Sequence, residues 1–574
     1  MTITSVSSIR RQALFETTKR VIASAVNDGL ARATIEASPS SNLSLTLRSP
    51  QATTDDEDTW IKCGVRVDAY IEMDGTDVLG FIRADDLLPP VLHRCTTGEV
   101  LEQLDPGVIC RVICLWRPEQ YSSDAVQALV NEVRNSADNQ AKWLEIAATL
   151  PKLHLMSPLT DWEQSVVVGH PTHLLHRACL AQSPLQPITP DDIPSVLQPE
   201  LSFLSVPRSQ MKASGPFEML LAPLLKALDI PNPKSPDRVV VPCFSRQLPS
   251  ILPLFPDAHR IGTAQNCCLA QLSMRTISFL PEVCFPLHIK LSLNCQITSG
   301  PRTITPWTAA LGPILSEALR DLVPPDLWVF EEVASITGGQ DDFDKARHLT
   351  CIIRKGLEQH AENLGEALIP VAGLYQKPFE HDQTYIEILF QLDNLKQKQS
   401  WFRRYVSRLF SLILPPLVRY GIGFESHSQN TLVRINLKTK QVVGFAVRDF
   451  GGIRIHYPTF CQSGHDLSAI PEGASTITHD MHAVLAKVHH SLFQVHVGHL
   501  LYMLGLESNG GWPIVCQELR NALNPGTDPA GKLVYDSFLQ EMMSNKCFME
   551  MRLKGVYRDL PNVLLRMHDD GRSP

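Results

Sequence analysis

Polar residues suited to nucleotide binding flank a predicted hairpin between residues 425 and 452. Residues 431–437 alternate in polarity and are rich in β-branched side chains, and the apolar run 442–447 suits a buried return strand. The flanking polar residues are His427, Gln429 and Asn430 before the first run, and Arg448 and Asp449 after the second. The start of one strand of a hairpin lies beside the end of its partner, so we expect Asn430 and Asp449 to face one pocket.

The side chains at this end of the hairpin fit a metal-bound nucleotide. Amide and carboxylate oxygens are hard ligands, so Asn430 and Asp449 suit Mg²⁺ that carries nucleotide phosphates. Arg448 adds a fork of donors for a phosphate or a carboxylate. Phosphotransferases use a similar layout, with an Asn before one strand and Asp-Phe-Gly after the next. The motif therefore predicts a nucleotide site without naming the reaction, and an ordinary hairpin with polar ends is the alternative.

A second group of candidate residues lies on the strand-like runs 269–280 and 287–305. It combines cations with hydroxyls: Ser273, Arg275, Thr276, Lys290, Thr298 and Arg302. Neighbouring strands that carry such groups would suit a polyanion. A half-exposed sheet with its polar residues outward would produce the same pattern.

Histidines form two further groups. Residues 170–173 read His-Pro-Thr-His and follow a short apolar run. This pair could hold zinc, contact a phosphate or carboxylate, or form a solvated turn, and no third metal ligand is evident nearby. A later group lies within 479–506, at His479, His482, His489, His490, His496 and His499. The late group lacks His-Glu-x-x-His spacing, so we interpret its members as histidines of a partly buried helix rather than metal ligands.

The periodicity predicts the elements that position these residues. Helices are expected over 8–33, 143–155, 309–322, 345–364 and 479–506, and over 385–420 with an interruption at the prolines 415 and 416. We expect a hairpin over 67–82 and a loop or weak strands over 37–58. The proline-rich residues 183–256 favour extended segments and turns.

Composition narrows the class of protein. A chain of 574 residues is too long for one core, so about two to four domains are expected. A net charge of −8 argues against a general nucleic-acid binder. We find no run of about 18 apolar residues that would span a membrane, and no apolar core of a signal peptide. The 14 cysteines lack paired Cys-x-x-Cys spacing and indicate reduced, mostly buried thiols in a cytoplasmic protein.

Four stretches together resemble one family. They are GHPTH at 169–173, SMRT at 273–276, KLSLNCQITSGPRT at 290–303, and the segment YGIGFESHSQN…RDFGG at 420–452. A weaker match is RHLTCIIR at 347–354. In order and approximate spacing they resemble the siderophore synthetases that work without nonribosomal peptide synthetases, of the aerobactin-synthetase type. The likeness covers residues 140–460 well and the ends loosely.

The resemblance implies a fold and a reaction. The fold would be an α+β cupped hand with mixed and antiparallel sheets: a thumb at 1–145, fingers at 146–384, and a helix-rich palm at 385–574. ATP and Mg²⁺ would convert a di- or tricarboxylic, citrate-like acid into an acyl-adenylate. An amine or alcohol would then attack, releasing AMP and giving an amide or ester for siderophore or related secondary metabolism. A homodimer is also implied.

Roles for individual residues follow from the same resemblance. Ser273, Arg275, Thr276, Lys290, His427, Gln429, Asn430 and Asp449 would bind the nucleotide, with Asn430 and Asp449 on the metal. The acid would be contacted by His170, Thr298, Arg302 and Arg448. The residues expected to act in catalysis are His170, Lys290 and Arg302.

The segment after the second histidine departs from the family pattern. The family commonly has Pro, Lys, Arg and Gly at places held here by Leu174, Arg177, Cys179 and Ala181. Three alternatives to the ligase therefore stay open: a phosphotransferase that releases ADP, an inactive metabolite-binding homologue, and a ferric-siderophore reductase. The reductase would want a cysteine-rich cluster site that the sequence does not show.

Overall fold

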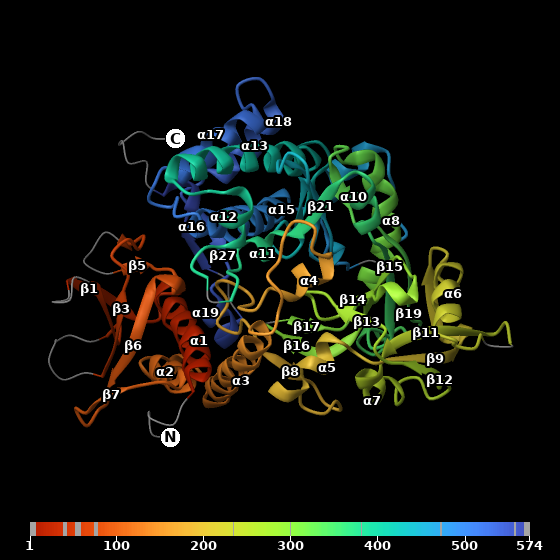
Figure 1. Cartoon of the computed structure of the whole chain (residues 1–574), viewed down its shortest axis with the longest axis horizontal. Coiled ribbons are helices and arrows are strands. Elements are labelled where there is room, and N and C mark those ends of the chain that lie inside the picture. Colours follow the sequence, from red (N-terminus) through yellow and green to blue (C-terminus); the bar gives the residue numbers. More distant parts are fainter. Residues whose placement is uncertain are drawn as a thin grey trace.

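The computed structural model describes residues 7–37, 43–51, 59–73, 79–232, 235–298, 300–379, 381–470, 473–555 and 558–566. Three regions follow one another along the chain and surround a common centre (Figure 1). The N-terminal region combines a five-stranded antiparallel sheet, in the order β1-β2-β3-β6-β7, with three helices. Its elements are α1 (Ser8–Asn27), β1 (Arg32–Ala37), β2 (Leu43–Arg48), β3 (Trp60–Val65), β4 (Glu72–Met73), β5 (Leu79–Phe81), β6 (Leu87–Arg94), β7 (Val100–Glu102), α2 (Pro106–Leu115) and α3 (Ser123–Ala147).

Local sequence explains where α1 starts and stops. The hydroxyl of Ser7 accepts a hydrogen bond from the Arg10 N–H at 3.2 Å and caps the helix. The helix ends at Asn27, short of the expected residue 33, because Gly29 adopts a φ of 68° and turns the chain into β1. Its inner face buries Val21, Ile22 and Val26 in the N-terminal core.

Two other predictions for the N-terminal region, the helix over 143–155 and the hairpin over 67–82, agree with the structure only in part. The helix expected over 143–155 is the end of α3, which stops at Ala147. The expected hairpin at 67–82 exists as the antiparallel pair β4 and β5, with its turn at 74–78 outside the described residues. A loop or weak strands were expected over 37–58, and β2 lies within this range. Residues 38–42 and 52–58 lie outside the described residues.

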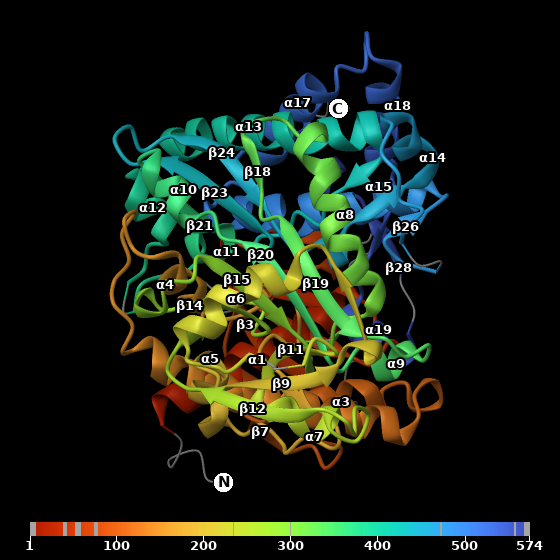
Figure 2. The ribbon, with the colours of Figure 1, turned by 90° about the vertical axis from the view of Figure 1, so that its right-hand side faces the viewer.

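The middle region carries a six-stranded sheet in the order β10-β19-β20-β15-β14-β13 and two three-stranded sheets, β11-β9-β12 and β17-β16-β8. Figure 2 shows the strands β9 and β12 of this middle region at the bottom of the molecule, far from the helix α13 (Leu395–Tyr420). Its elements are α4 (Leu159–Gln164), β8 (Cys179–Ala181), α5 (Ile193–Leu197), β9 (Leu201–Pro207), β10 (Met211–Ser214), α6 (Phe217–Ala227), β11 (Arg238–Phe244), α7 (Leu248–Ile251), β12 (His259–Ala264), β13 (Cys268–Ala270), β14 (Thr276–Phe279), β15 (Leu287–Leu291), β16 (Leu293–Ile297), β17 (Gly300–Arg302), α8 (Pro306–Leu322), β18 (Leu327–Val329), β19 (Glu332–Gly338), α9 (Phe343–Ala346), β20 (Thr350–Lys355), α10 (Glu358–Asn363), β21 (Glu366–Pro370) and α11 (Val371–Leu374).

The strands predicted over 269–280 and 287–305 are confirmed, and the helix predicted over 345–364 is wrong. That segment contains β20, which lies between β15 and β19 in the six-stranded sheet. Its apolar, partly β-branched residues Cys351, Ile352 and Ile353 are fully buried there, and sheet packing outweighs the helical spacing of the flanking residues. The proline-rich residues 183–256 are largely strands and turns as expected, but α6 forms through Pro223 because it buries Phe217, Leu221 and Leu224.

The C-terminal region packs helices against a four-stranded sheet in the order β18-β24-β23-β21. Its elements are α12 (Tyr385–Phe390), α13 (Leu395–Tyr420), β22 (Ile422–Gly423), β23 (Thr431–Asn436), β24 (Val442–Val447), β25 (Arg454–His456), α14 (Tyr457–Phe460), β26 (Ile477–Thr478), α15 (Met481–Val488), the π-helix η10 (His489–Val497), α16 (Gly498–Met503), α17 (Gly511–Leu523), α18 (Pro529–Phe538), β27 (Met542–Asn545), α19 (Phe548–Lys554) and β28 (Arg558–Pro561). The predicted hairpin is confirmed as β23 and β24, with Thr431 opposite Val447.

The interruption predicted at Pro415 and Pro416 is wrong. Helix α13 continues through both prolines and ends at Tyr420, where Gly421 follows with a left-handed φ of 66°. The apolar side of the helix, including Tyr405 and Leu409, is buried in the C-terminal core, and this packing compensates for the hydrogen bonds that the prolines remove.

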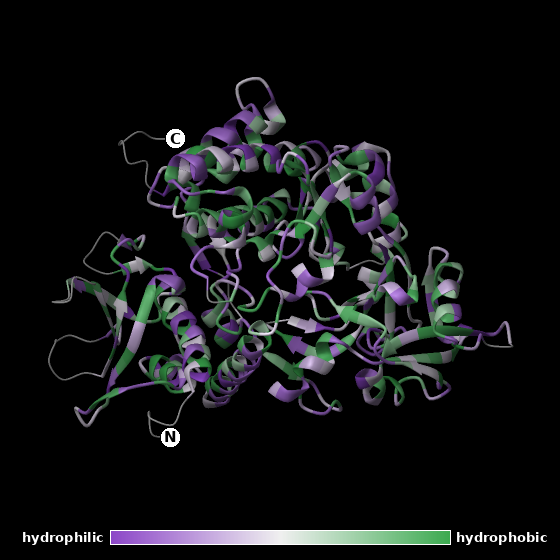
Figure 3. Cartoon of the chain, viewed as in Figure 1, coloured by the Kyte–Doolittle hydropathy of each residue, from purple (hydrophilic) through white to green (hydrophobic). Residues whose placement is uncertain are grey.

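The hydrophobic cores connect the regions. Green, apolar positions in Figure 3 lie on the strands and on the inner helix faces. Leu174, Leu175 and Met549 pack with the N-terminal core, and Leu311 and Leu315 of α8 pack with the C-terminal core. All fourteen cysteines are free and most are buried, as expected. In the described part of the chain, no helix has the length and apolar character to cross a bilayer.

Candidate active site

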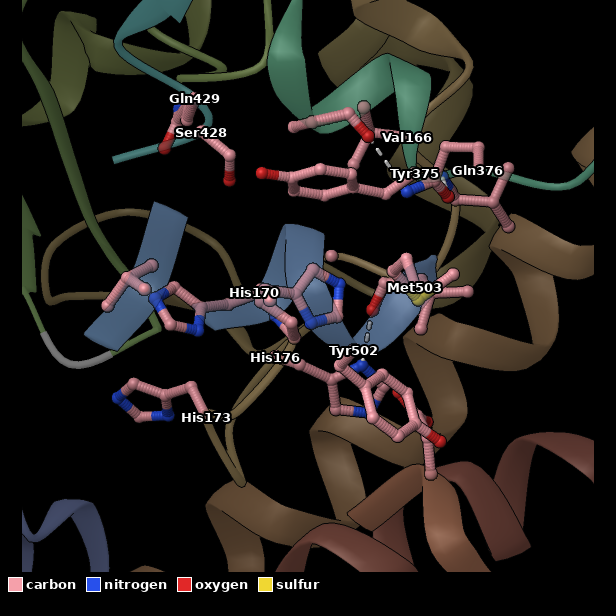
Figure 4. A pocket seen from close by; sticks show the side chains of 18 of the residues that line it. Val166, His170, His173, His176, Tyr375, Gln376, Ser428, Gln429, Tyr502 and Met503 are labelled. Atoms are coloured by element: carbon pink, nitrogen blue, oxygen red, sulfur yellow. Dashed lines mark hydrogen bonds between the residues drawn. The ribbon is translucent and has the colours of Figure 1, made fainter. Parts of the chain in front are cut away.

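A cavity of about 1210 Å³ is lined by all three regions. Its walls come from α1, the loop 165–177, the strand ends of the middle region, the segment 425–430 and the helical segment 490–509. Figure 4 shows His170, His173 and His176 in this pocket, with Ser428, Gln429 and Tyr375 on the opposite side. The candidate residues that line the cavity are His170, Ser273, Thr298, Arg302, His427, Gln429, Asn430 and Asp449.

The hairpin brings Asn430 and Asp449 together as the sequence predicts. The Arg448 N–H donates to the Asn430 carbonyl at 3.1 Å, beside the register pair Thr431 and Val447. Asp449 adopts a φ of 68°, an uncommon conformation for a residue other than glycine that is often found at functional sites. The Asn430 side chain is buried and lines the cavity, and it makes no hydrogen bond within the described residues. Its amide is thus available to a ligand.

The Asp449 carboxylate is held ionised by cations behind it. Lys290 Nζ donates to Asp449 Oδ1 at 2.8 Å and to Glu332 Oε1 at 3.2 Å, and Arg275 Nη2 lies 3.9 Å from Asp449 Oδ2. Burial alone would raise the pKa of Asp449, but Lys290 and Arg275 hold that pKa well below its usual range. A fully ionised carboxylate beside an unengaged amide fits the oxygen donor set that Mg²⁺ prefers.

Gly452 lets the turn after Asp449 approach a neighbouring carboxylate. A Cβ at Gly452 would overlap the Glu425 side chain. Glu425 forms an ion pair with Lys487, and its pKa is lowered because Lys487 and His427 outweigh the effect of burial. Only glycine allows this close packing of the Phe450-Gly451-Gly452 turn.

Arg302 presents an incompletely paired guanidinium to the cavity. Its Nη2 donates to the Ile297 carbonyl at 3.1 Å, whereas its buried Nε has no hydrogen-bond partner among the described residues. Burial, followed by the charge of Arg275, lowers the pKa of Arg302 to about 10. Thr298, 3.5 Å from Arg302 Nη2, has a φ of 57°, which strains a β-branched residue. A buried, incompletely paired guanidinium that lines the cavity is suited to an anionic ligand.

His170 is a neutral donor. Its Nδ1 accepts the Thr172 N–H at 3.3 Å, so the neutral ring carries its proton on Nε2. Burial, with His173 and His427 next, lowers the pKa of His170 well below its usual value. The rings of His170 and His173 pack against Phe548, with centroid distances of 5.6 and 4.2 Å. The described residues include no group of three or more His, Cys, Asp or Glu side chains placed to hold a metal, so the zinc alternative finds no ligand set there.

The predicted contact by Arg448 is not supported by the structure. Its guanidinium is buried and does not line the cavity. Its donors bond to Glu163, to Gln271 and to the Gln429 carbonyl, and this network fixes the loop that carries Gln429 and Asn430. Arg448 therefore positions the loop, and no donor is left for a substrate.

Arg275, Thr276 and Lys290 also lie behind the cavity wall. Arg275 Nη1 donates to the carbonyls of Arg302 and Thr303 at 3.3 and 3.2 Å, and Thr276 Oγ1 accepts from Ser273 Oγ at 3.0 Å. Lys290 is 1 % exposed and reaches Asp449, as described above. These residues set the charge and position of Asp449, Arg302 and Ser273 without lining the cavity themselves.

The late histidines bond mainly to the protein. His496 lies between the Tyr405 hydroxyl at 2.7 Å and the Ser426 carbonyl at 2.8 Å, and His489 Nε2 is 2.9 Å from Asn562 Oδ1. They lie in η10, the π-helical stretch in the middle of the expected helix. His490 and His499 nevertheless line the cavity, which the sequence interpretation did not anticipate.

Sequence reasoning missed charged residues from both ends of the chain. They line the same cavity: Glu16, Lys19, Arg20, Asp85, Asp86, Glu425, Glu507 and Lys546. Burial, followed by Lys487, lowers the pKa of Lys546. Glu425 belongs to a quoted motif, and the run Glu-Thr-Thr-Lys-Arg at 16–20 places charges directly before the apolar residues Val21 and Ile22 of the expected helix, which was an available signal. Lys546 lies in the stretch Met-Met-Ser-Asn-Lys-Cys-Phe-Met at 542–549, and nothing in that stretch marks it as part of a site.

Two protein-family models match different parts of the chain. The model of the IucA / IucC family matches residues 222–376, and the model of the ferric iron reductase FhuF-like transporter matches residues 399–560. The cysteines in the second match are Cys461, Cys516 and Cys547, and the described residues form no metal-binding group around them.

Curated relatives extend over most of the sequence. The NRPS-independent siderophore synthetase-like protein ankE of Aspergillus thermomutatus is 40% identical over 97% of this chain and 93% of its own length. The NRPS-independent siderophore synthetase rfs of Rhizopus delemar is 31% identical over 72% of this chain and 67% of its own length. Staphyloferrin A synthase of Staphylococcus aureus is 29% identical over 52% of this chain and 50% of its own length.

Solved structures share the whole fold. The petrobactin biosynthesis protein AsbB of Bacillus anthracis superposes with a TM-score of 0.77 at 17% identity, covering 98% of this chain and 96% of that chain. ATP-bound aerobactin synthetase IucA of Klebsiella pneumoniae gives a TM-score of 0.73 at 16% identity, covering 98% and 100%. With the curated relatives, these matches confirm the resemblance drawn from the four motifs, and the chain belongs to the family of NRPS-independent siderophore synthetases.

Proposed function

We propose that the chain is an ATP-dependent, AMP-forming ligase that joins a di- or tricarboxylic acid to an amine or alcohol. The observation that carries this proposal is the pairing, in one cavity, of an ionised Asp449 beside Asn430 with the buried cation Arg302 and the neutral His170. The first pair suits a metal-bound nucleotide, and the second suits an anionic acid. Siderophore or related secondary metabolism is the process we propose, in line with the names of the relatives.

The proposed first step is attack of a carboxylate oxygen on the α-phosphorus of ATP, with loss of pyrophosphate. Both reactants are anions, so the site must offset their repulsion. Mg²⁺ held by Asn430 and Asp449 would neutralise phosphate charge. The Arg302 guanidinium, which lines the cavity, and the Nε2–H of His170 would hold the acid and stabilise charge that develops on phosphate oxygens. Lys290 keeps Asp449 ionised and in place without touching the substrate.

The second step is attack by the neutral nitrogen or the oxygen of the nucleophile on the acyl carbon. The bond from that carbon to the bridging oxygen breaks, AMP leaves, and the nucleophile gives up one proton, which is released to solvent. His170 carries its proton on Nε2, so it enters this step as a hydrogen-bond donor rather than a base.

The departures at 174–181 favour an active enzyme over an inactive homologue. Leu174 and Cys179 are buried in the cores, and neither they nor Ala181 line the cavity. Arg177 lines it, but its guanidinium donates to the Val166 and Val167 carbonyls and lies 3.8 Å from the Trp143 ring centroid. The changed residues therefore support the wall and leave Arg302, His170 and Asp449 in place.

We also propose the cupped-hand division into 1–145, 146–384 and 385–574, a homodimer and a cytoplasmic location, following the resemblance. The three regions of the fold support the division, although cores cross its boundaries.

Nucleotide product analysis tests the ligase. The chain is incubated with Mg·ATP, a panel of di- and tricarboxylic acids, and hydroxylamine as a small nucleophile. AMP, pyrophosphate and the hydroxamate of one acid are expected. ADP would favour the phosphotransferase, and nucleotide binding without turnover would favour the inactive homologue.

A further inference from the structure

Three loops from distant parts of the sequence form walls of the cavity. They are the acid loop at 165–170, the middle loop at 272–273 and the nucleotide loop at 428–430. Figure 4 shows His170 of the acid loop and Gln429 of the nucleotide loop in the same pocket. In the proposed reaction the acid loop contacts the acid, and the nucleotide loop contacts the metal-bound nucleotide. The first step therefore depends on how closely the position of one loop is fixed relative to the other.

The buried carboxylate of Glu163 links these loops. Glu163 lies in α4, two residues before the acid loop begins, and it is 2 % exposed. Its Oε2 accepts the N–H of Leu272 in the middle loop at 2.9 Å. Both of its oxygens accept donors of the Arg448 guanidinium, Oε2 at 3.1 Å. Glu163 itself does not line the cavity, so it acts on the loops and not on a ligand.

Arg448 extends the link to the nucleotide loop. Its Nε and Nη2 donate to the Gln429 carbonyl at 3.1 and 2.8 Å, and its backbone N–H donates to the Asn430 carbonyl at 3.1 Å. Its Nη1 also donates to Oε1 of Gln271, the residue before the middle loop, at 3.2 Å. The Glu163 carboxylate thus orients a guanidinium whose donors hold the nucleotide loop.

The acid loop is attached to the end of α4 and to the wall beside it. Ser165 Oγ donates to the Trp162 carbonyl at 2.8 Å, and the Val167 N–H donates to Gln376 Oε1 at 3.2 Å. Trp162 is fully buried, which fixes the end of the helix. A shift of the Glu163 carboxylate relative to α4 would therefore change the spacing between the acid loop and the other two loops.

We propose that Glu163 is a positioning residue that holds the acid loop and the nucleotide loop in the relative position that the first step needs. This inference rests on the proposed ligase and adds a residue that acts on its rate through Arg448 and Leu272. Each loop keeps its own ligand contacts when Glu163 changes, so each ligand should still bind. The placement of one reactant against the other should suffer, and a misplacement of about 1 Å can lower a rate about 100-fold.

Glu163→Gln tests the inference, because it keeps the size of the side chain and one acceptor but removes the charge that pairs with Arg448. Glu366→Gln is the matched control. Glu366 accepts Nε of the buried Arg434 at 2.8 Å and its Nη2 at 3.0 Å, and neither residue lines the cavity. Both changes take a carboxylate from a buried guanidinium, and of the two pairs it is the first that joins cavity loops.

Two measurements separate rate from binding and from folding. Calorimetric titration with Mg·α,β-methylene-ATP gives the nucleotide affinity and the number of functional sites in each protein. AMP release with hydroxylamine then gives kcat per functional site and KM for the acid selected by the product analysis. For Glu163→Gln we expect kcat to fall about 10- to 100-fold, with the nucleotide affinity and KM within about threefold of the unchanged protein. For Glu366→Gln all three quantities should stay within about threefold.

A second variant tests the same role without leaving a cation unpaired. Glu163→Asp keeps the charge but shortens the side chain by one methylene, so it changes the spacing of the loops. We expect kcat to fall about 3- to 10-fold, again with little change in binding.

Unchanged kcat in both Glu163 variants would overturn the inference, as would an equal fall of kcat per functional site in Glu366→Gln. A change confined to KM or to nucleotide affinity would also overturn it, because Glu163 would then act on binding. Absence of AMP formation in the unchanged protein is a different outcome and contradicts the ligase itself.

Discussion

Among single residues, the proposed reaction depends most on how the Asp449 carboxylate is kept ionised. The carboxylate faces the cavity while Lys290 lies behind it at 2.8 Å, in contact with Glu332 as well. Lys290 thus positions the Asp449 carboxylate, and this carboxylate would bind the metal. Removing either one leaves an uncompensated charge.

Asp449→Asn is expected to lower kcat/KM with Mg·ATP by about 100- to 1000-fold, because the metal loses its charged ligand and Lys290 loses a partner. Steady-state AMP release measures the effect. Asp466→Asn, which changes an exposed carboxylate of the same region, serves as the matched control. Near-normal turnover in Asp449→Asn would remove this residue from the metal site.

Arg302→Ala should reduce transition-state stabilisation by about 2–4 kcal/mol, or roughly 30- to 1000-fold in kcat/KM for the acid. The reason is loss of the buried, incompletely paired guanidinium beside the acid. Arg260→Ala, at an exposed position of β12, is the control for loss of a positive charge. Unchanged kinetics in Arg302→Ala would place the acid elsewhere.

The sequence predicted which residues belong to the site better than it predicted which of them face the cavity. Asn430 and Asp449 were found because hairpin register fixes which residues meet. Arg448 and Lys290 were assigned to ligands because a motif marks a residue as part of the site but does not tell which way its side chain points. The buried partners Glu163 and Glu332 decide that question, and they lie far away in the sequence.

At the scale of elements, the cavity wall depends on a cap between distant segments. Asp28 follows α1, and its Oδ2 accepts the N–H groups of Met549 at 2.9 Å and Glu550 at 3.1 Å at the start of α19. Helix α19 begins with Phe548, which packs on His170 and His173. A residue of the N-terminal region thereby fixes the position of an aromatic side chain in the site.

Asp28→Ala should lower stability by about 1–2 kcal/mol because two N–H groups lose their acceptor, whereas Asp28→Asn keeps an acceptor. Burial raises the pKa of Asp28 to about 7 in the folded protein, against about 4 when unfolded. Between these values the folded state binds more protons, so the contribution of Asp28 to stability falls as pH rises from about 4 to 7.

Thermal unfolding across this pH range measures both effects. Relative to Asp28→Asn, the unchanged protein should lose melting temperature as pH rises through that range. A parallel pH dependence of the two proteins would contradict the assignment, and equal melting of Asp28→Ala and Asp28→Asn would show that the cap contributes nothing.

Element prediction succeeded where packing agrees with local pattern and failed where it does not. Strands β23 and β24 follow from alternation and a polar turn. Strand β20 was taken for a helix because its neighbours 343–346 and 358–363 are helical and its own run is short. The interior of the six-stranded sheet, which no local window shows, determines its state.

In the whole molecule, the N-terminal region completes the wall of a cavity that the middle and C-terminal regions also line. Arg83 and Glu507 form a buried ion pair across this junction, and Arg83 Nη2 also donates to the Gly498 carbonyl at 3.2 Å. Glu507 and Asp86 both line the cavity, so the junction also shapes the N-terminal end of the cavity.

A double-mutant cycle tests that junction. Glu507→Gln should destabilise the chain by about 3–5 kcal/mol, because it leaves Arg83 buried without its partner. Arg83→Met combined with Glu507→Gln should recover part of the loss. Melting temperatures of the four proteins measure the coupling, and strictly additive shifts would mean that the two residues do not act as a pair.

The arrangement of three regions could be expected from the family resemblance, but the contribution of the N-terminal region to the cavity could not. Its charged residues Lys19, Asp85 and Asp86 belong to no motif, and they become neighbours of the site only through the packing of α1 and the short helix η2 (Ala84–Asp86) against the C-terminal helices. Such contacts depend on side chains separated by hundreds of residues.

The most direct test for an acyl-adenylate intermediate follows the oxygen of the acid. The acid that supports AMP release is labelled with ¹⁸O in its carboxylates and incubated with Mg·ATP and an amine, and the phosphorus products are analysed by mass spectrometry. An acyl-adenylate requires the bridging oxygen to leave with AMP, so the account predicts one ¹⁸O in AMP and none in pyrophosphate. Formation of ADP with ¹⁸O in inorganic phosphate would mean an acyl phosphate, and ADP without transfer of ¹⁸O would mean a phosphotransferase; either result would contradict the account.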